Sequence, residues 1–288
     1  MVNRGIPGLG NRAAIAVAYD YAPGDDIPPH SHYGGQFDYA TSGVMTVKTE
    51  HGTWVVPPHR AVWIPPRTEH EASLTGAVAM RTVFVAPASC RRMPDRCVVV
   101  SVSTLLRELI LAAIEVGEVQ RLNPHEQRLI GVLLDQMHAA EPMPGHLAHP
   151  SEPRLRELTD ELLRDLSDGR TLQDCAVALG MAARTFARLY LRETGMTFGA
   201  WRQQQRLMES MRLLAAGSSV TEAALATGYD STSAFIAMFR RAMGVSPGKF
   251  FQGGKHRPNG AHAQASSSGP PLSSTLPSME TTLGRSSQ

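Results

Sequence analysis

The hydrophobic pattern of the chain changes near residue 100. Before that point, short apolar runs alternate with turns rich in proline and glycine. The runs lie at residues 13–19, 37–40, 44–48, 54–56, 61–64 and 78–85. Regular punctuation of short extended segments is typical of a small β-barrel or sandwich. We therefore expect residues 11–86 to form β structure.

Beyond residue 100 the apolar positions follow the helical period of 3.6 residues. Residues 103–117 and 123–139 predict two amphipathic helices, the second opened by Asn123-Pro124, a pair that favours a helix start. These helices can pack on the barrel or on a second copy of the chain. Residues 154–251 are helical in pattern almost throughout.

Two segments rich in proline or glycine separate these regions. Residues 141–153 hold four prolines in thirteen positions, which indicates a partly extended linker. Residues 252–288 are rich in Gly, Ser and Pro, so we expect a disordered tail. We therefore predict an α+β multidomain protein, with a barrel plus helices at 1–140 and an all-α domain at 154–251.

The helical half contains an internal repeat at a spacing of 48–49 residues. Residues 176–181 (AVALGM) correspond to 224–229 (ALATGY), and residues 195–201 correspond to 244–250. Each copy offers a small residue for close helix approach and a glycine for a tight turn with positive φ. Aromatic residues on the following helix can then lock it in place. This is the pattern of a helix-turn-helix motif.

An ordinary helical hairpin repeated for packing is the alternative. Two copies with the same Gly-x-[Thr/Ser] ending favour DNA binding instead. Thr171 with Asp174 resembles a capping box, and Ser231 can cap the helix of the second copy. Residues 197–216 can form one helix of about 27 Å, at about 1.5 Å per residue. Such a strut could set two recognition helices about 34 Å apart, in successive major grooves.

Residues 154–251 resemble the DNA-binding domain of the AraC/XylS family of bacterial transcription regulators. The most specific part is Gly228-Tyr-Asp-Ser-Thr-Ser-Ala-Phe-Ile-Ala-Met-Phe-Arg-Arg-Ala-Met-Gly-Val-Ser-Pro247. The resemblance implies a sensor domain and a domain that binds double-stranded DNA, in a protein that is often a homodimer. RNA polymerase is a further candidate partner. Ala182 stands where the family usually has a capping Ser, and Phe251 where it often has Arg.

The family pattern implies a groove-facing set on each recognition helix. The set is Arg184, Ala187 and Arg188 in the first helix, and Thr232, Ser233 and Ala237 in the second. Arginine reads guanine O6 and N7 bidentately, so Arg184 and Arg188 are the expected base readers. The second helix suits thymine-methyl contacts and backbone anchoring. The candidate phosphate contacts, each of which also fits a solvated surface charge, are Arg192, Arg202, Arg206, Arg240, Arg241 and Lys249.

Three histidines in the first half have spacings that resemble the two cupin motifs. The segments are Gly24-x5-His30-x-His32-x3-Gln36-x6-Gly43 and Pro65-x4-His70. The resemblance implies that His30, His32, Gln36 and His70 meet inside a small barrel. Three imidazoles and one oxygen suit Zn, Ni, Cu, Mn or Fe, so a divalent transition metal is a candidate cofactor.

Two positions depart from the cupin pattern: Gln36 replaces the metal-binding Glu, and Arg67 replaces a usual Gly. The alternative is that the histidines line a ligand pocket without metal, or are hydrogen-bonded structural residues. We expect the wall of an effector pocket to include Tyr33, Gln36, Tyr39, Trp54 and Trp63. Each of these aromatic residues also fits as plain core. Residues 61–70 resemble a subgroup of AraC-type regulators with cupin-like sensors, which favours sensing over catalysis.

Charge and cysteine content refine this picture. The net charge is +2, but residues 1–153 carry twelve basic and fifteen acidic residues, and residues 154–251 carry thirteen and ten. An acidic front half and a basic back half indicate two different tasks. Three cysteines without CxxC spacing predict a reducing compartment. The longest early apolar run, residues 13–19, is too short for a signal peptide or a membrane span, so we expect a cytoplasmic protein.

Together these features predict a sequence-specific DNA-binding transcription regulator, not an enzyme, that responds to a small-molecule effector in the barrel. Residues 103–140 are expected to make a homodimer. One alternative is a cupin-type metal-dependent enzyme fused to a DNA-binding module. Another is a ligand-independent regulator whose barrel serves only for dimerisation.

Overall fold

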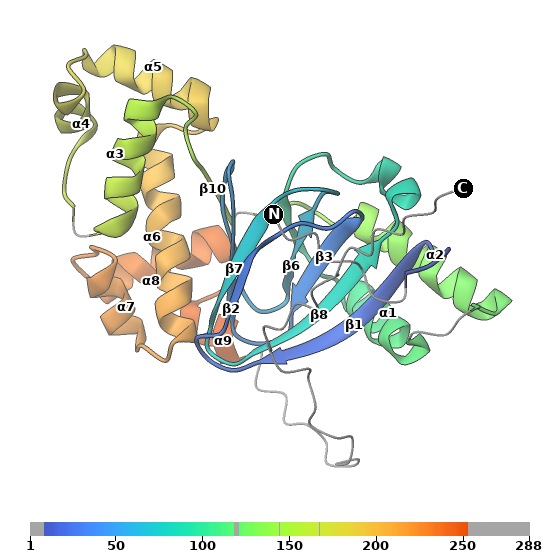
Figure 1. Cartoon of the computed structure of the whole chain (residues 1–288). Coiled ribbons are helices and arrows are strands. Elements are labelled where there is room, and N and C mark those ends of the chain that lie inside the picture. The colour runs from blue at the N-terminus through green and yellow to red at the C-terminus, as the bar shows by residue number, and fades with distance from the viewer. Residues whose placement is uncertain (1–8, 118–120, 144, 167, 253–288) are drawn as a thin grey trace, which may run out of the picture. The chain divides into compact units, whose positions relative to one another are not determined.

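Two antiparallel sheets form the first half of the chain in the computed structural model, which describes residues 9–117, 121–143, 145–166 and 168–252 (Figure 1). The first sheet has the order β1 (Ala14–Tyr21), β8 (Val78–Val85), β3 (Gly35–Ala40), β6 (Arg60–Ile64), β9 (Val98–Ser101). The second has the order β10 (His146–Ala148), β5 (Gly52–Val56), β4 (Val44–Thr49), β7 (His70–Thr75), β2 (Asp26–His30). The β structure predicted for residues 11–86 is confirmed. A short 3-10 helix, η1 (Pro87–Arg92), follows β8.

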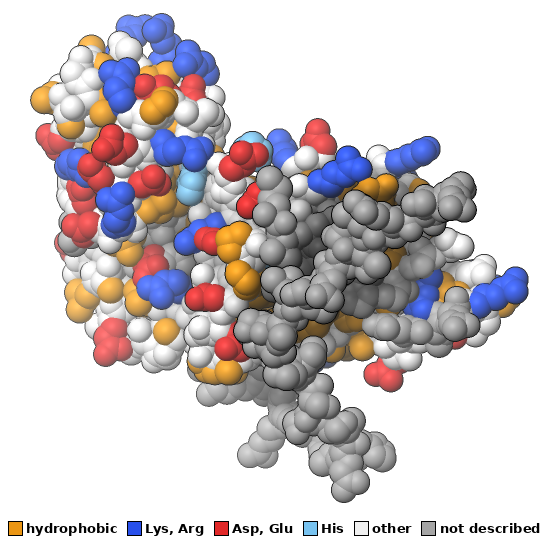
Figure 2. All heavy atoms as spheres, in the orientation of Figure 1, with side chains coloured by type: hydrophobic (Ala, Val, Ile, Leu, Met, Phe, Trp, Pro, Cys, Tyr) orange, Lys and Arg blue, Asp and Glu red, His pale blue; other side chains and the backbone are white. Residues whose placement is uncertain are grey.

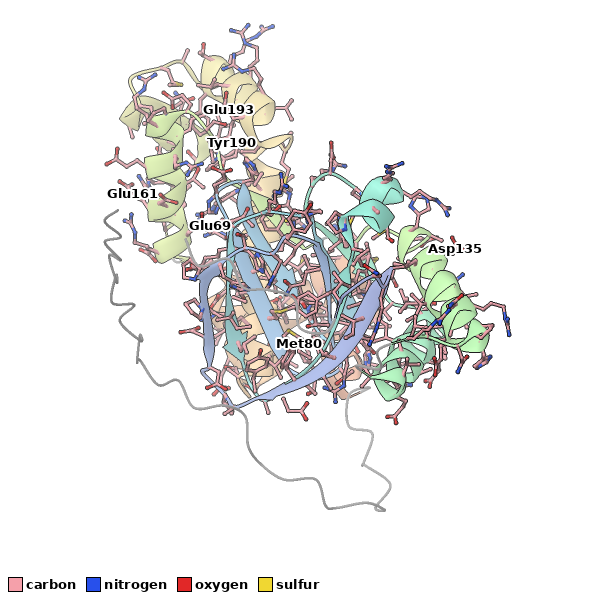
Figure 3. All side chains as sticks on the ribbon, turned by 45° about the vertical axis from the view of Figure 1, so that its right-hand side comes forward. Glu69, Met80, Asp135, Glu161, Tyr190 and Glu193 are labelled. Atoms are coloured by element: carbon pink, nitrogen blue, oxygen red, sulfur yellow. The ribbon has the colours of Figure 1, made fainter. Side chains whose placement is uncertain are left out.

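The two faces of the first sheet bury different residues, because strand side chains alternate between faces. One face meets the second sheet in an interior cluster that includes Met45, Val47, Val62, Ile64, Leu74 and Met80. Met80 lies among the strands in Figure 3. The other face carries Phe37, Tyr39 and Trp63, and it packs against two helices, α1 (Thr104–Val116) and α2 (Pro124–His138). The helices predicted at 103–117 and 123–139 therefore pack on the barrel.

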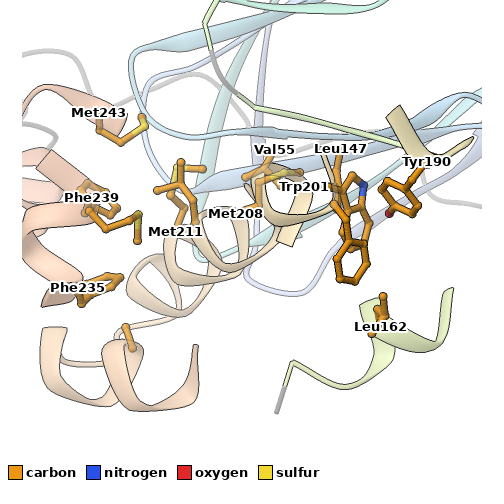
Figure 4. Close-up of a cluster of buried hydrophobic side chains, with 14 of the residues drawn as sticks. Val55, Leu147, Leu162, Tyr190, Trp201, Met208, Met211, Phe235, Phe239 and Met243 are labelled. Atoms are coloured by element: carbon orange, nitrogen blue, oxygen red, sulfur yellow. The ribbon is translucent and has the colours of Figure 1, made fainter. Parts of the chain in front are cut away.

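Seven helices follow in the described part of the second half. They are α3 (Pro153–Arg164), α4 (Leu172–Ala178), α5 (Ala183–Thr194), α6 (Phe198–Ala215), α7 (Val220–Ala226), α8 (Thr232–Met243) and α9 (Pro247–Gln252). Their core is aromatic and rich in methionine; Figure 4 shows Tyr190, Trp201, Met208, Phe235 and Phe239 among its members. All five side chains are at most 4% exposed, so this cluster supplies the apolar burial that holds the short helices together.

The segment 141–153 contributes a strand. In β10, His146, Leu147 and Ala148 pair with Trp54, Thr53 and Gly52 of β5. The Trp201 indole Nε1 donates a 3.0 Å hydrogen bond to the carbonyl oxygen of Ala148. The division of the chain at 140, 153 and 251 stays a prediction, and the disordered tail predicted at 252–288 lies, beyond Gln252, outside the described residues.

Candidate DNA-binding surface and barrel site

The first repeat forms a helix-turn-helix from α4 and α5. The Thr171 side chain accepts from the backbone N–H of Asp174, while the Asp174 carboxylate accepts from the backbone N–H of Thr171, so the predicted capping box is confirmed. Gly180 has a φ of 65°, and the following Met181 N–H donates to the carbonyl of Ala176 at 3.0 Å. Phe186 on α5 is fully buried and fixes the second helix.

The second repeat, α7 and α8, follows the same plan. Ser219 and Glu222 form its capping box, Gly228 has a φ of 76°, and the Tyr229 N–H donates to the carbonyl of Ala224 at 3.0 Å. Phe235 occupies the buried position equivalent to that of Phe186. The 18-residue helix α6 connects the two motifs, as predicted.

The caps of the two second helices differ. The Ser231 hydroxyl accepts from the backbone N–H of Ala234 at 3.2 Å and caps α8, as predicted. Ala182, at the N-cap of α5, makes no side-chain hydrogen bond. The departure from the family pattern at Ala182 therefore leaves one orphan N–H more at the start of α5 than at the start of α8.

Most of the predicted DNA-facing residues lie at the surface. Arg184, Arg188 and Arg192 of α5 are exposed, and Figure 2 shows Lys and Arg side chains gathered over the end of the molecule where α5 lies. On α8 the exposed residues of the set are Ser233, Ala237, Arg240 and Arg241, whereas Ala187 and Thr232 are half-buried.

Arg202 is the exception among the candidate phosphate contacts. It is buried, donates to the carbonyl of Asp168, and donates to Gln205 Oε1 at 3.3 Å. Burial lowers the pKa of its guanidinium. Arg202 therefore braces α6 against the segment before α4, and the prediction of a phosphate contact at this position is wrong. No sequence signal separated it from its neighbour Arg206, because both lie on one helix of mixed pattern.

Three histidines meet inside the barrel. Ligand nitrogens of His30, His32 and His70 lie within 4.8 Å of one another, and all three residues are buried. His30 closes β2 and pairs across the sheet with His70, which opens β7. His30 Nδ1 donates to the carbonyl of Pro28 at 2.8 Å, and His70 Nδ1 donates to that of Thr68 at 2.9 Å. These bonds fix the tautomer that leaves each Nε2 with a lone pair.

Desolvation by burial lowers the pKa of His70 to about 4. The ring is therefore neutral near pH 7, the state that a metal or a hydrogen-bond donor requires. Within the described chain, His70 Nε2 is buried and has no hydrogen-bond partner.

A tight turn sets the second motif beside the first. Arg67 has a φ of 62°, a left-handed conformation that disfavours most side chains, at the position where the cupin pattern usually has Gly. Its N–H donates to the carbonyl of His32 at 2.7 Å, and its guanidinium lies 5.2 Å from the ring centroid of Tyr33. The turn is therefore kept although the glycine is not.

Gln36 belongs to a buried polar chain on β3 and β8. Gln36 Nε2 donates to Asp38 Oδ2 at 2.8 Å, and Thr82 Oγ1 donates to Asp38 Oδ1 at 2.7 Å. Desolvation raises the pKa of Asp38 to about 6, against the opposing effect of these two hydrogen bonds. Gln36 Oε1 is buried without a partner among the described residues.

The five predicted effector-binding residues do not come together. Gln36 and Trp54 lie on the interior side of the sheets, but Tyr39 and Trp63 lie on the face that packs against α1 and α2. Trp63 Nε1 donates to the carbonyl of Pro94 there. Tyr33 is 58% exposed. Tyr39 and Trp63 are therefore core residues, which was the alternative interpretation of these aromatics.

A groove of about 1350 Å³ opens next to His70. Its lining includes Trp54, Cys97, Met143, His146 and His149. The ring of His146 stacks on the Trp54 indole, with centroids 4.5 Å apart and an interplanar angle of 12°. Sequence reasoning missed Met143, His146 and His149, because they lie in a proline-rich segment without apolar periodicity.

An antiparallel barrel followed by a tandem of helix-turn-helix motifs defines a class of protein, a DNA-binding regulator with a barrel in its first half. Residues 154–253 match the helix-turn-helix domain family, and residues 17–86 match the cupin domain family. Over 246 residues the chain is 35% identical to the HTH-type transcriptional regulator NimR of Escherichia coli (strain K12), covering 85% of this chain and 89% of that protein. The chain therefore belongs to the AraC/XylS family of transcription regulators, as predicted.

Further similarities cover about a third of this chain or have low sequence identity. The HTH-type transcriptional regulator RipA of Corynebacterium glutamicum is 33% identical over 104 residues, which are 36% of this chain and 31% of RipA. The DNA-binding domain of AdpA, solved in complex with a target DNA, is 31% identical with a TM-score of 0.35 and covers 38% of this chain and 100% of that one. ToxT from Vibrio cholerae is 11% identical with a TM-score of 0.36, covering 84% and 98%. Among the described residues, no helix has the length and apolar character needed to cross a bilayer.

Proposed function

We propose that this transcription regulator senses a small molecule at its cupin barrel and carries no enzymatic activity of its own. The observation that supports this is the groove of about 1350 Å³ lined by Trp54, His70 and His146, which reaches both the histidine cluster and β10. Because β10 immediately precedes the helical half, an effector there contacts the segment that connects the two regions. By linkage, the effector can change DNA affinity only as far as it binds the two states unequally.

DNA recognition is proposed for the exposed faces of α5 and α8. Arg184 and Arg188 would read guanines, Arg192, Arg240 and Arg241 would contact phosphates, and Ser233 and Ala237 would meet the groove on the second helix. The protein would act in the cytoplasm, where its DNA target lies. A homodimer is proposed through α1 and α2, which expose Leu105 and Val132. RNA polymerase remains a candidate partner.

The test of DNA recognition starts with selection of bound genomic fragments. The affinity for a selected operator should fall steeply as salt rises, because arginines that neutralise phosphates release counterions. Affinity that stays flat between 50 and about 200 mM salt would contradict a basic groove contact. A thermal-shift screen of metals and small molecules then tests sensing, because a ligand that binds only the folded state raises the unfolding temperature. A barrel that serves only for dimerisation would give no shift with any compound.

A divalent transition metal in the barrel fits the residues present. Three buried imidazoles, two of which (His30 and His70) keep an Nε2 lone pair, form with the unpartnered Gln36 Oε1 a set of three nitrogens and one oxygen among the described residues. His30, His32, His70 and Gln36 would hold the ion. A bound ion would supply a Lewis-acidic position at which an effector oxygen or nitrogen can be recognised.

Elemental analysis of untagged protein tests the metal. We expect one metal per chain in the wild type and loss of that metal in the double variant His30→Ala/His32→Ala. Metal that persists at full stoichiometry in the double variant would place the ion elsewhere. The enzyme alternative predicts turnover that consumes O2 with Fe(II); a metal-loaded protein that binds an effector unchanged contradicts it.

A further inference from the structure

The neutral Gln36 is the unusual member of the proposed ligand set, and its amide is held by one neighbour. Gln36 is 7% exposed, and its Nε2 donates to Asp38 Oδ2 at 2.8 Å. Asp38 is 3% exposed, and its second oxygen accepts from the hydroxyl of Thr82, which is fully buried. Both hydrogen bonds run toward the carboxylate, so the chain Gln36–Asp38–Thr82 is consistent with an ionised acceptor.

This chain decides which end of the amide is available. A carboxylate only accepts, so Asp38 takes the NH2 end of Gln36 and leaves the oxygen end without a donor. Gln36 Oε1 has no partner within the described residues although it is buried. A buried acceptor of this kind needs a donor or a cation to offset its lost hydration.

The strand register places Gln36 beside a residue that contacts the histidines. Gln36 lies directly opposite Phe84 in the β3–β8 pair, so the two side chains share a face of the sheet. The ring of Phe84 packs against that of His32, with centroids 5.2 Å apart. Gln36 therefore stands one neighbour away from the cluster in which His70 Nε2 is also unpartnered within the described chain.

The carboxylate of Asp38 has no positively charged side chain to balance it among the described residues. No Lys or Arg of the described chain forms an ion pair with Asp38. A buried carboxylate without a nearby cation is unfavourable, and a divalent ion beyond Gln36 would compensate it.

We propose that Asp38 is the positioning residue of this site: it orients Gln36 so that Oε1 faces the metal, and it supplies from one residue further out the negative charge that a glutamate ligand would carry. The proposal rests on the metal proposed above. An acidic ligand supplies both a coordinating oxygen and a negative charge, and here two residues share these roles. Gln36 provides the oxygen, and Asp38 provides the charge through the amide.

Zn²⁺ and Co²⁺ titrations of the metal-stripped full-length protein test this division. Asp38→Asn keeps the shape and removes the charge, so we expect metal affinity to fall about 10–100-fold, the usual effect of losing an outer partner. Gln36→Glu/Asp38→Asn moves the charge onto the ligand itself, and we expect it to recover at least the wild-type affinity. The matched control is Asp26→Asn, an exposed residue on the same strand as His30, which should bind metal as the wild type does.

The possible outcomes distinguish failure of the positioning role of Asp38 from failure of the metal site on which it rests. A wild type that binds neither ion would overturn the metal site and, with it, the role of Asp38. A wild type that binds metal, with Asp38→Asn equally tight, keeps the metal and refutes positioning by Asp38. A loss in Asp38→Asn without recovery in the double variant also refutes it, since a merely structural defect would not be repaired by adding Gln36→Glu. The Co²⁺ absorption band, which reports the ligand field, should change in Asp38→Asn and remain unchanged in Asp26→Asn.

Discussion

The two helix-turn-helix motifs share a frame and differ in what they present. In both, a capping box opens the first helix, a glycine with φ between 65° and 76° makes the turn, and an N–H after the turn closes on the small residue five positions earlier. In both, a phenylalanine without exposed surface, Phe186 or Phe235, anchors the second helix. The same capping, turn and buried aromatic contacts therefore stabilise both motifs.

The exposed faces show no such agreement. Arg184 and Arg188 of α5 correspond, at a spacing of 49 residues, to Ser233 and Ala237 of α8. The first motif thus offers long bidentate donors where the second offers a hydroxyl and a methyl group. Burial therefore constrains the packed residues of each motif, whereas the exposed residues that face DNA are free to vary, so the two helices can contribute unequally to recognition.

The largest expected effect is on the free energy of unfolding, when a buried phenylalanine shared by the two motifs is removed. Phe186→Ala and Phe235→Ala each remove a fully buried aromatic side chain. Each should lower the free energy of unfolding by about 3–5 kcal/mol, measured by urea denaturation with helical signal as the probe. The exposed Leu225→Ala should change it by less than about 0.5 kcal/mol. A large loss from one phenylalanine and a negligible loss from the other would contradict the equivalence of the frames.

The next effect tests the unequal reading surfaces. Arg188→Ala should weaken binding to a selected operator by about 1–3 kcal/mol and relax the preference at one base position, because a bidentate guanine contact is lost. Its counterpart on α8, Ala237, has no such contact to lose, and the hydroxyl of Ser233 makes at most a single hydrogen bond, so Ser233→Ala should have the smaller effect. Binding to a randomised operator library measures both. Unchanged specificity in Arg188→Ala, or an equal loss in Ser233→Ala, would remove the asymmetry.

The same contrast explains what the sequence could and could not predict. Gly180, Gly228, Phe186 and Phe235 were predictable, because tight turns and buried anchors recur at fixed local spacings. His70 could be grouped with His30 because the spacing of the two cupin-like motifs indicates that their strands, here β2 and β7, pair with each other. The structural roles of these residues could therefore be predicted from their spacing in the sequence.

The barrel pocket was harder to predict for a physical reason. All six residues of β3 are buried, because one face meets the second sheet and the other meets α1 and α2. Because side chains alternate along β3, Tyr39 points to the other face of the sheet from Gln36. Hydropathy cannot say which of the two faces is the barrel interior when both are covered. The burial of Arg202 and the stacking of His146 on Trp54 depend on contacts between distant segments, which no local pattern records.

The smallest effect concerns the caps, the one place where the frames themselves differ. Ser231→Ala removes the hydroxyl that accepts from the Ala234 N–H, and it should lower the free energy of unfolding by about 0.5–2 kcal/mol. Ala182→Ser gives α5 the cap it lacks and should raise the free energy of unfolding, by no more than that amount. Urea denaturation of both variants and of their combination measures the two changes, which should add because the sites are separate. If Ala182→Ser left stability unchanged while Ser231→Ala lowered it, the start of α5 would already be satisfied by other groups, and the capping difference would have no energetic meaning.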